Sequence, residues 1–414
     1  MAPMKNFITV VVALVTLIFL ISCGGGNLRT SSGSNGSSSG SSSGQSVPGF
    51  GEGTGSSGQS SPAKFLYANP LPGGGPFANV IQADGTLSPG QSLLANNNDP
   101  QTLAVDPSGS FLFQTALGFN GTQGGIYAYA IDRSSGSLTQ ATGSPYLTNQ
   151  AFYSDVVDQQ GKYLFAQGSS GIYAFTIASG TGALTPVSGS PFPAPGPTVI
   201  FSQPANRIAL DQTNRFLYVS GSTGIAAYSI NQNTGQLTTI SGSPFGASVN
   251  NPFAIVVAPS NKFLYETHSA NDANLYGYSV DQTTGALTPL AGSPFNRGQC
   301  GANVGGANGS PDNMTIASAG KFLYLANCAT YSIDPNTGVL VQVSNFIPGD
   351  WPVIDPTGNL LWAITSAQNC FHCEIGVSSY QVDPNTGNLT LIPNSFLPLT
   401  NSAVGFVGAL AITK

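Results

Sequence analysis

A short motif, one polar residue followed by three large apolar residues, recurs seven times along this 414-residue chain. The copies are Lys64–Tyr67, Ser110–Phe113, Lys162–Phe165, Arg215–Tyr218, Lys262–Tyr265, Lys321–Tyr324 and Asn359–Trp362. A second motif, Gly-x-Leu, also recurs seven times, at Leu87, Leu138, Leu184, Leu237, Leu287, Leu340 and Leu389. Both motifs have a period of about 50 residues, which indicates a repeat architecture in which each unit packs against the next.

Each repeat unit predicts four short strands. In the second unit the strands are expected at residues 103–106, 111–113, 126–131 and 137–140. The turns between them are rich in Asp, Pro, Ser and Gly, and β-branched and aromatic residues fill the strands. Seven units of four antiparallel strands predict an all-β fold, a seven-bladed β-propeller of four-stranded antiparallel blades.

The two ends of the repeat region predict how the ring closes. Lys64 begins a unit at its second strand, and Ala409–Thr413 matches the first strand of a unit. We therefore expect the C-terminal strand to join blade 1 and to close a propeller that spans residues 63–414.

The N-terminal region predicts export and a lipid anchor. Lys5 precedes an apolar run from Phe7 to Ile21, which is long enough for a signal-peptide core but short for a membrane span. Leu20-Ile21-Ser22-Cys23 resembles a bacterial lipobox, so residues 1–22 are expected to be cleaved and Cys23 to carry palmitate-type acyl chains. Residues 23–62 would then be a lipidated cysteine followed by a flexible Gly/Ser-rich tether.

These features predict a protein of the cell envelope. The membrane anchor would hold it on the periplasmic or cell-surface side, and the outer membrane is favoured in a Gram-negative host because Gly24 is not an aspartate. With 11 basic and 17 acidic residues, the chain has a net charge of −6 and no basic stripe, which argues against nucleic acid as a partner. A monomer is expected.

Most of the acidic residues recur in phase with the repeat, which predicts turn capping rather than chemistry. Four precede the second strand of their units, and five precede the fourth. They are Asp106, Asp158, Asp211 and Asp355, and Asp84, Asp132, Asp281, Asp334 and Asp383. We call the face of the propeller that carries these turns the turn face.

The polar residues that fall out of phase map to the opposite face, which we call the mouth face. Its loops join the second strand to the third and join successive units. The candidates for ligand binding are Asp99, Asp155, Asp272, Arg297, Asp312, Asp350, Trp351 and His372. Those for catalysis are Glu374, His268 and Arg207. Convergent polar groups at a concave mouth are the usual signature of a site.

Each of these candidates also has a structural explanation. The histidines fit solvated loop residues, the arginines fit partners for Asp312 and Asp350, and Trp351 fits a plug at the ring centre as well as a sugar-stacking surface. A metal site or other cofactor is not predicted, because a cysteine ligand would have to stay reduced outside the cytoplasm.

Four cysteines remain after Cys23, and an even number in an exported protein predicts disulfides. Of the three possible connectivities we favour Cys300–Cys328 with Cys370–Cys373. A redox role for Cys370-Phe-His-Cys373 is not favoured, because no helix N-terminus is expected there to lower the thiol pKa.

The repeat resembles the bacterial YVTN-type and lactonase-like seven-bladed propellers. The resemblance lies in Lys321–Asn327, Ala104–Gly109, Tyr331–Gly338 and four copies of Gly-Ser-Pro-aromatic, and it covers about 350 residues. It implies the propeller fold and, through the lactonases that hydrolyse 6-phosphogluconolactone, a hydrolase in which Glu374 or His268 is the base and Arg207 or Arg297 the electrophilic partner.

The sequence alone favours another function. The Gly-Pro-Arg-His type of entry into the first strand of those enzymes is missing, and sugar phosphates are cytoplasmic whereas this chain is expected outside the cytoplasm. A rim rich in Asn, Ser, Thr and Gly suits a neutral glycan, a peptide or an envelope protein. We therefore expect a binding or scaffold module first and a lactonase-like hydrolase as the alternative.

Overall fold

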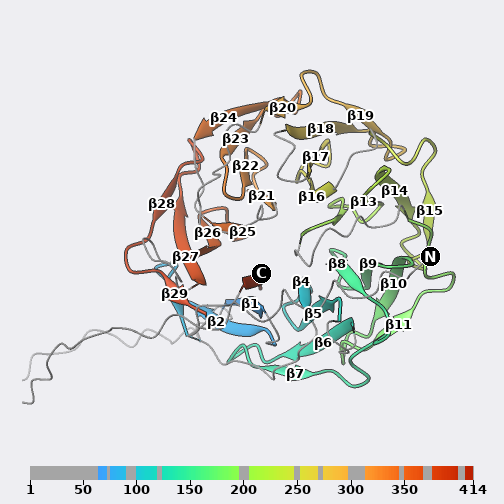
Figure 1. The fold of residues 1–414 in the computed structure, drawn as a ribbon, viewed down its shortest axis with the longest axis horizontal. Helices are drawn as coiled ribbons and strands as arrows, with labels where there is room; N and C mark the ends of the chain where they lie inside the picture. Colours follow the sequence, from blue (N-terminus) through green and yellow to red (C-terminus); the bar gives the residue numbers. More distant parts are fainter. Residues whose placement is uncertain are drawn as a thin grey trace, which may run out of the picture. The chain divides into compact units, whose positions relative to one another are not determined.

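The computed structural model describes residues 64–71, 75–89, 99–118, 124–194, 205–246, 252–268, 274–296, 313–344, 349–366, 375–399 and 406–413. All of them belong to one compact unit, Ser60–Lys414, and they form thirty strands joined by turns (Figure 1). None of these segments is a helix of the length and apolarity that crossing a membrane requires.

The strands form seven antiparallel sheets, each of which is one blade. Blade 1 contains β1 (Phe65–Leu71), β2 (Phe77–Ile81), β3 (Leu87–Ser88) and β30 (Phe406–Ile412), and blade 2 contains β4 (Pro100–Val105), β5 (Phe111–Ala116), β6 (Gly125–Ile131) and β7 (Leu138–Gln140). Blade 3 contains β8 (Phe152–Val157), β9 (Tyr163–Gly168), β10 (Gly171–Ile177) and β11 (Leu184–Pro186), and blade 4 contains β12 (Ile208–Leu210), β13 (Phe216–Gly221), β14 (Gly224–Ile230) and β15 (Leu237–Thr239).

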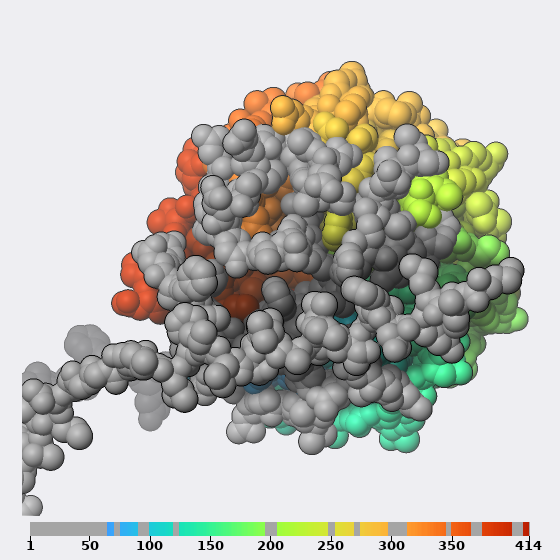
Figure 2. Space-filling view, in the orientation of Figure 1, coloured from blue at the N-terminus to red at the C-terminus, as the bar shows by residue number. Residues whose placement is uncertain are grey.

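The remaining blades follow the same order. Blade 5 contains β16 (Pro252–Val257), β17 (Phe263–His268), β18 (Asn274–Val280), β19 (Leu287–Pro289) and β20 (Phe295–Asn296). Blade 6 contains β21 (Met314–Ile316), β22 (Phe322–Leu325), β23 (Thr330–Ile333) and β24 (Leu340–Ser344), and blade 7 contains β25 (Asp350–Ile354), β26 (Leu360–Ser366), β27 (Ile375–Val382), β28 (Leu389–Leu391) and β29 (Leu397–Pro398). Successive blades follow one another in sequence order around the rim (Figure 2). The predicted seven-bladed propeller is confirmed.

The ring closes through the C-terminal strand, as the sequence predicts. β30 is the innermost strand of blade 1, where Leu66 pairs with Ile412 and Tyr67 with Ala411. The indole N–H of Trp351 in blade 7 donates to the carbonyl of Leu410 at 3.1 Å. The closing strand is therefore held by the last blade as well as by the first.

The two repeated motifs meet between neighbouring blades. Gly136, in a turn of blade 2, has φ +74°, and a Cβ there would lie 2.4 Å from Phe65 of blade 1. The Tyr67 hydroxyl donates to the Gly136 carbonyl at 2.9 Å. The equivalent aromatic–glycine pairs are Phe111–Gly182, Tyr163–Gly235, Phe216–Gly285, Phe263–Gly338 and Phe322–Gly387. Only glycine leaves room for this blade-to-blade contact, which explains why both motifs share one period.

The in-phase aspartates cap turns, as predicted. One carboxylate oxygen of Asp106 accepts the N–H groups of Ser110 and Phe111 at 2.7 and 2.6 Å, and the other accepts Ser108 N–H at 3.0 Å. Asp158, Asp211 and Asp355 accept equivalent bonds in their own blades. These contacts satisfy backbone donors that strand pairing leaves unpaired.

The Gly-Ser-Pro-aromatic segments cover the outer part of four blades. The hydroxyl oxygens of Ser144, Ser190, Ser243 and Ser293 each accept a backbone N–H from the third strand of their blade at 2.9–3.0 Å. The aromatic residue that follows pairs with the same strand. The motif is therefore structural, and chemistry has to come from residues outside it.

Candidate functional site at the mouth face

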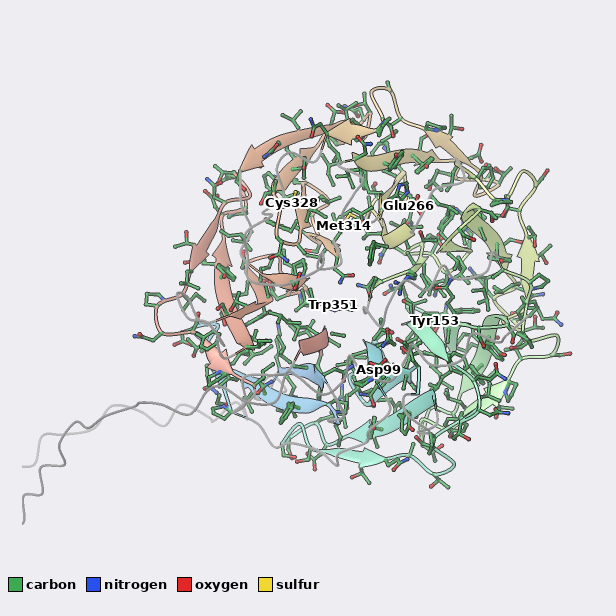
Figure 3. All side chains as sticks on the ribbon, in the orientation of Figure 1. Asp99, Tyr153, Glu266, Met314, Cys328 and Trp351 are labelled. Carbon is green, nitrogen blue, oxygen red and sulfur yellow. The ribbon has the colours of Figure 1, made fainter. Side chains whose placement is uncertain are left out.

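Side chains from several blades lie around the centre of the ring. Figure 3 labels Asp99, Tyr153, Glu266, Met314 and Trp351, which come from five different blades and surround the centre of the ring. The innermost strands begin on this face, so the residues that enter them are brought together from distant parts of the sequence.

The segment that carries Arg207 is fixed by three other blades. The backbone N–H of Arg207 donates to Ser154 Oγ in blade 3 at 3.2 Å. Asn206 donates its N–H to Asn313 Oδ1 at 3.1 Å, and its carbonyl accepts Ile255 N–H at 2.8 Å. Arg207 is thereby held immediately before β12, at the place that the sequence predicts.

Arg207 is a buried cation. Its side chain is 7% exposed, and its guanidinium carbon lies 5.8 Å from the centre of the Phe253 ring in blade 5. Burial lowers the pKa of the guanidinium to about 10, and the neighbouring Tyr153 phenol opposes that shift. The group therefore keeps its charge at neutral pH, in surroundings that strengthen its interaction with an anion.

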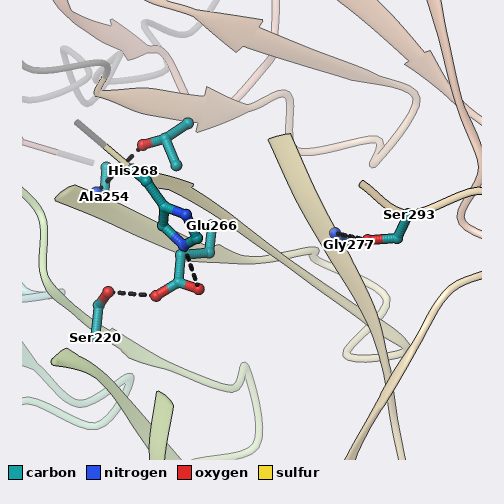
Figure 4. Close-up of polar contacts among 7 residues, drawn as sticks. Ser220, Ala254, Glu266, His268, Gly277 and Ser293 are labelled. Carbon is teal, nitrogen blue, oxygen red and sulfur yellow. Dashed lines mark hydrogen bonds and ion pairs between the residues drawn. The ribbon is translucent and has the colours of Figure 1, made fainter. Parts of the chain in front are cut away.

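The side chains of Glu266 and His268 form a buried contact in blade 5. His268 Nε2 lies 3.1 Å from Glu266 Oε2, and the two side chains are 1% and 2% exposed. The Ser220 hydroxyl in blade 4 donates to the other carboxylate oxygen, Oε1 (Figure 4). The carboxylate therefore accepts a hydrogen bond on one oxygen and contacts the imidazole with the other.

The position of His268 differs from the sequence expectation of a loop. It is the last residue of β17, its backbone pairs with Pro252 of β16, and its ring stacks on Tyr276 with centroids 4.2 Å apart. The sequence motif ends at Tyr265, whereas strand β17 continues for three more residues to His268. Strand pairing and burial distinguish His268 from a solvated loop residue.

Arg207 and His268 are joined through blade 4. The Arg207 carbonyl accepts Ser220 N–H at 2.9 Å, the Ser220 hydroxyl donates to Glu266, and Glu266 contacts His268. Phe253, over which the guanidinium lies, is the neighbour of Pro252, the backbone partner of His268. The two sequence-predicted residues are thus linked through backbone and side-chain contacts of one group of residues, comprising Arg207, Ser220, Phe253, Glu266 and His268, which we call the blade 4–5 cluster.

Asp155 lies in blade 3, within β8 rather than at its start. Its Oδ1 accepts a hydrogen bond from Thr102 of blade 2, whose hydroxyl is 2.7 Å from that of Thr115. Its Oδ2 is buried without a hydrogen-bond partner. Burial raises the pKa of Asp155 to about 7, and the bond from Thr102 opposes the rise.

Asp99, Asp350 and Trp351 lie at strand entries, as predicted. Asp99 (φ 53°) and Trp351 (φ 50°) adopt a left-handed backbone that such residues rarely use, and each precedes a proline at a β-bulge. Burial raises the pKa of Asp99 to about 6. Trp351 is 3% exposed and packs against the closing strand, and Asp350 accepts a hydrogen bond from Asn327.

The remaining predicted site residues lie outside the described residues, and their roles stay predictions. They are Cys23, Asp272, Arg297, Cys300, Asp312, Cys370, His372, Cys373 and Glu374. Cys328 is 2% exposed and forms a disulfide whose partner also lies outside the described ranges, so the pairing with Cys300 stays a prediction. Within the described ranges, no group of three or more His, Cys, Asp or Glu side chains is arranged to hold a metal ion.

The sequence analysis missed Glu266 and Ser220. Glu266 occupies the position directly after the Phe-Leu-Tyr motif, where the other six copies have Ala68, Gln114, Ala166, Val219, Leu325 and Ala363. An acidic residue at a repeat position that is otherwise uncharged was the signal that could have revealed it. Ser220 carries no such signal, because hydroxyl and amide residues recur at its repeat position.

Comparison with known families identifies one match. Residues 163–300 match the family described as "Lactonase, 7-bladed beta-propeller", a range that contains the whole blade 4–5 cluster. No curated protein sequence matches the chain significantly. The chain is a seven-bladed β-propeller that matches the lactonase family over these residues.

Solved structures share the fold at low sequence identity. A periplasmic gluconolactonase from Pseudomonas aeruginosa is 18% identical, with TM-score 0.62 and coverage of 85% of this chain and 99% of that one. A Bacteroides fragilis protein named provisionally as a 6-phosphogluconolactonase is 18% identical (TM-score 0.63, 86% and 99% covered), and a Lactobacillus plantarum protein is 20% identical (TM-score 0.63, 86% and 100% covered). At these identities the likeness concerns the fold.

Proposed function

We propose that the protein hydrolyses a lactone at the mouth face, with His268 as the general base and Arg207 as the cation that stabilises the oxyanion. The observation that carries this proposal is the blade 4–5 cluster, in which hydrogen bonds run from the backbone carbonyl of Arg207 through Ser220 and Glu266 to the His268 imidazole. The match to the lactonase family over residues 163–300 supports it, because both residues lie in that range.

The chemistry needs a base and an electrophilic group on either side of a carbonyl. His268 takes a proton from water, and the water oxygen forms a bond to the lactone carbonyl carbon. Arg207 stabilises the negative charge that develops on the carbonyl oxygen. The ring C–O bond then breaks, and the leaving alkoxide takes the proton from His268, which leaves a hydroxy acid.

The burial of both residues fits this chemistry and sets a condition on it. His268 is 1% and Arg207 is 7% exposed, so a substrate reaches them only when the atoms that cover them move. Exclusion of water from such a site strengthens the interaction between the guanidinium and the oxyanion.

Proton release from a panel of sugar and aliphatic lactones tests the proposal directly. The full chain is expected to hydrolyse at least one of them, and His268→Ala is expected to lower kcat by on the order of 10²–10⁴-fold. Circular dichroism and thermal unfolding of each variant report whether its fold is retained. Glu374→Gln, measured in parallel, tests the other base that the sequence predicts.

If no lactone in the panel is hydrolysed, the proposed hydrolase function is contradicted. A binding or scaffold module is then the function to test. Retention of full turnover in a folded His268→Ala variant contradicts the role of this histidine. If no lactone is hydrolysed, binding of neutral glycans, peptides and envelope proteins should be tested on the mouth face.

We also propose that the protein is a lipoprotein of the cell envelope, anchored at Cys23, and that Cys300–Cys328 and Cys370–Cys373 are its disulfides. The apolar run, the lipobox-like sequence and the Gly/Ser-rich stretch support the anchor. Labelling with a palmitate analogue in a bacterial host is expected to mark the wild type and not Cys23→Ser. Equal labelling of both forms contradicts the anchor.

A further inference from the structure

A groove on the turn face separates blade 6 from blade 7, its neighbour in the ring (Figure 1). Its volume is about 780 Å³, and small-molecule sites typically measure roughly 300–1,000 Å³. Blade 6 forms one wall, and the turn between β27 and β28 of blade 7 forms the other. The residues that line the groove include Lys321, Phe322, Ile333, Val343, Asn385 and Asn388.

Blade 6 lacks an oxygen atom that the other blades provide at the start of the second strand. In blades 2, 3, 4 and 7 one aspartate oxygen accepts two successive backbone N–H groups there. Asp106, for example, accepts those of Ser110 and Phe111. Blade 5 uses the hydroxyl of Ser260 and blade 1 that of Thr413, each for one N–H group.

In blade 6 both capping positions hold alanine. Ala317 replaces the aspartate, and Ala319 replaces the serine of blade 5. Within the described ranges, the backbone N–H groups of Lys321 and Phe322 have no hydrogen-bond acceptor. Both residues line the groove, so a ligand oxygen can take the place of the missing side chain. The repeat indicates that a carboxylate fits, because four blades place one there.

The side chain of Lys321 favours an anion at the same place. Its equivalent in blade 3, Lys162, donates to the Gln232 carbonyl of the next blade at 3.0 Å. Among the described residues, Lys321 makes no such contact with blade 7. Asp334 and Asp383 lie in the turns beside the groove, and each carboxylate accepts N–H groups of its own turn. Their negative charges favour a ligand with a single carboxylate.

A buried hydroxyl at this junction also lacks its partner. At the equivalent position, the hydroxyls of Tyr67, Tyr218 and Tyr265 donate to a glycine carbonyl in a turn of the next blade at 2.7–2.9 Å. Tyr324 is fully buried, but its hydroxyl has no hydrogen-bond partner. Burial raises the pKa of Tyr324, and the charge of Asp383 raises it further. The neutral phenol is thus an unused donor near the blade 7 turn that lines the groove.

We propose that this groove binds a small aliphatic monocarboxylate. Its carboxylate takes the place of the missing aspartate, at the N–H groups of Lys321 and Phe322. Its aliphatic chain lies along the apolar wall, which includes Ile333 and Val343, and Val343 is 41% exposed. The site is a binding site and uses no residue of the blade 4–5 cluster, so it does not depend on the proposed lactone hydrolysis.

Titration of the full chain with hexanoate tests the proposal. Carbon-13 NMR of hexanoate labelled at its carboxyl group measures the dissociation constant, and N-acetylleucine represents the C-terminus of a peptide. We expect binding of at least one of these carboxylates, and the tighter of the two identifies a free acid or a peptide terminus as the source. Hexanamide, which has no charge, is expected to bind at least about 10-fold more weakly than hexanoate. Failure of both carboxylates to bind overturns the proposal.

Ala317→Asp supplies the missing carboxylate from the protein itself. It is expected to weaken carboxylate binding by at least about 10-fold and to leave the thermal unfolding temperature unchanged or raised, because the cap is restored. Ala258→Asp, at the same repeat position in blade 5, is the matched control and is expected to leave binding unchanged. Equal binding by the two variants contradicts the assignment of the site.

Lys321→Gln tests the charge without changing the turn. Lys321 is exposed, so this variant is expected to fold even if Ala317→Asp does not. Its affinity for the bound carboxylate is expected to fall by about 10-fold. Lys262→Gln, at the same repeat position in blade 5, is expected to bind like the wild type. If Lys321→Gln binds as tightly as Lys262→Gln, the proposal is wrong.

Discussion

The turn face and the mouth face of this propeller are built from the same seven repeats, yet they differ in kind. On the turn face the same contacts recur: four blades have an aspartate cap before the second strand, and at six blade junctions an aromatic ring packs against a glycine of the next blade. On the mouth face the blades diverge, and Glu266, His268 and Arg207 each occur once. The repeated contacts stabilise the ring. The residues that depart from the repeat are the ones available for chemistry.

The pKa of Asp132 on the turn face is shifted in the opposite direction to those of Asp155 and Asp99 on the mouth face. On the turn face, the hydroxyl and the backbone N–H of Ser134 hold the pKa of Asp132 at about 2. On the mouth face, burial raises the pKa of Asp155 to about 7 and that of Asp99 to about 6. Asp132 therefore favours the ionised form, and the mouth face holds two carboxylates that are easier to protonate.

The largest stability effect is expected from Asp155. Its folded pKa is raised above the unfolded value of 3.8, so its contribution is fully present below about pH 4 and is lost as the pH rises through about 7. The unfolding free energy is expected to fall by up to about 4 kcal/mol over this range. Urea unfolding between pH 4 and 8 measures the fall, and Asp155→Asn is expected to flatten it.

Asp132→Asn is the matched change on the turn face. The folded pKa of Asp132 is lowered, so its contribution is present above about pH 4 and is lost as the pH falls toward 2. This variant is expected to alter the acid side of the stability curve and to leave the pH 4–8 range unchanged. An identical pH dependence for both variants contradicts the distinction between the faces.

A smaller effect is expected from a glycine of the turn face. Gly182 has φ +69°, and a Cβ there would lie 2.5 Å from Phe111 of the preceding blade. Gly182→Ala is expected to cost about 3 kcal/mol through backbone strain and overpacking. In the same turn, a Cβ at Gly180 meets nothing within 4 Å, so Gly180→Ala is the control and is expected to change stability by less than about 0.5 kcal/mol. Equal costs contradict the aromatic–glycine contact.

The smallest effect is expected from one hydroxyl group. Tyr218 donates to the Gly285 carbonyl at 2.9 Å, so Tyr218→Phe is expected to lower the unfolding free energy by about 1 kcal/mol. Tyr324 occupies the same repeat position in blade 6, but its hydroxyl is buried without a hydrogen-bond partner. Tyr324→Phe is therefore expected to be neutral or stabilising, and a loss equal to that of Tyr218→Phe contradicts this explanation.

The sequence predicts the turn face better than the mouth face for a physical reason. The caps and aromatic–glycine contacts depend on residues at fixed offsets, such as Asp106 and Phe111, so a periodic pattern reveals them. The contacts of the mouth face join residues of different blades, such as Ser220 with Glu266, and no spacing encodes them. Arg207 and His268 were found because they break the repeat, whereas the burial of His268 depends on strand pairing beyond its motif.

The central claim is that chemistry takes place on the mouth face and that the turn face only supports it. Two arginines of blade 4 test this directly: Arg207 belongs to the blade 4–5 cluster, and Arg215 on the turn face donates to the Gln282 carbonyl at 2.8 Å. Steady-state lactone hydrolysis by Arg207→Gln and Arg215→Gln is the measurement. The account predicts a loss of on the order of 10²–10³-fold in kcat for Arg207→Gln and wild-type turnover for Arg215→Gln. Equal rates in the two variants would contradict it.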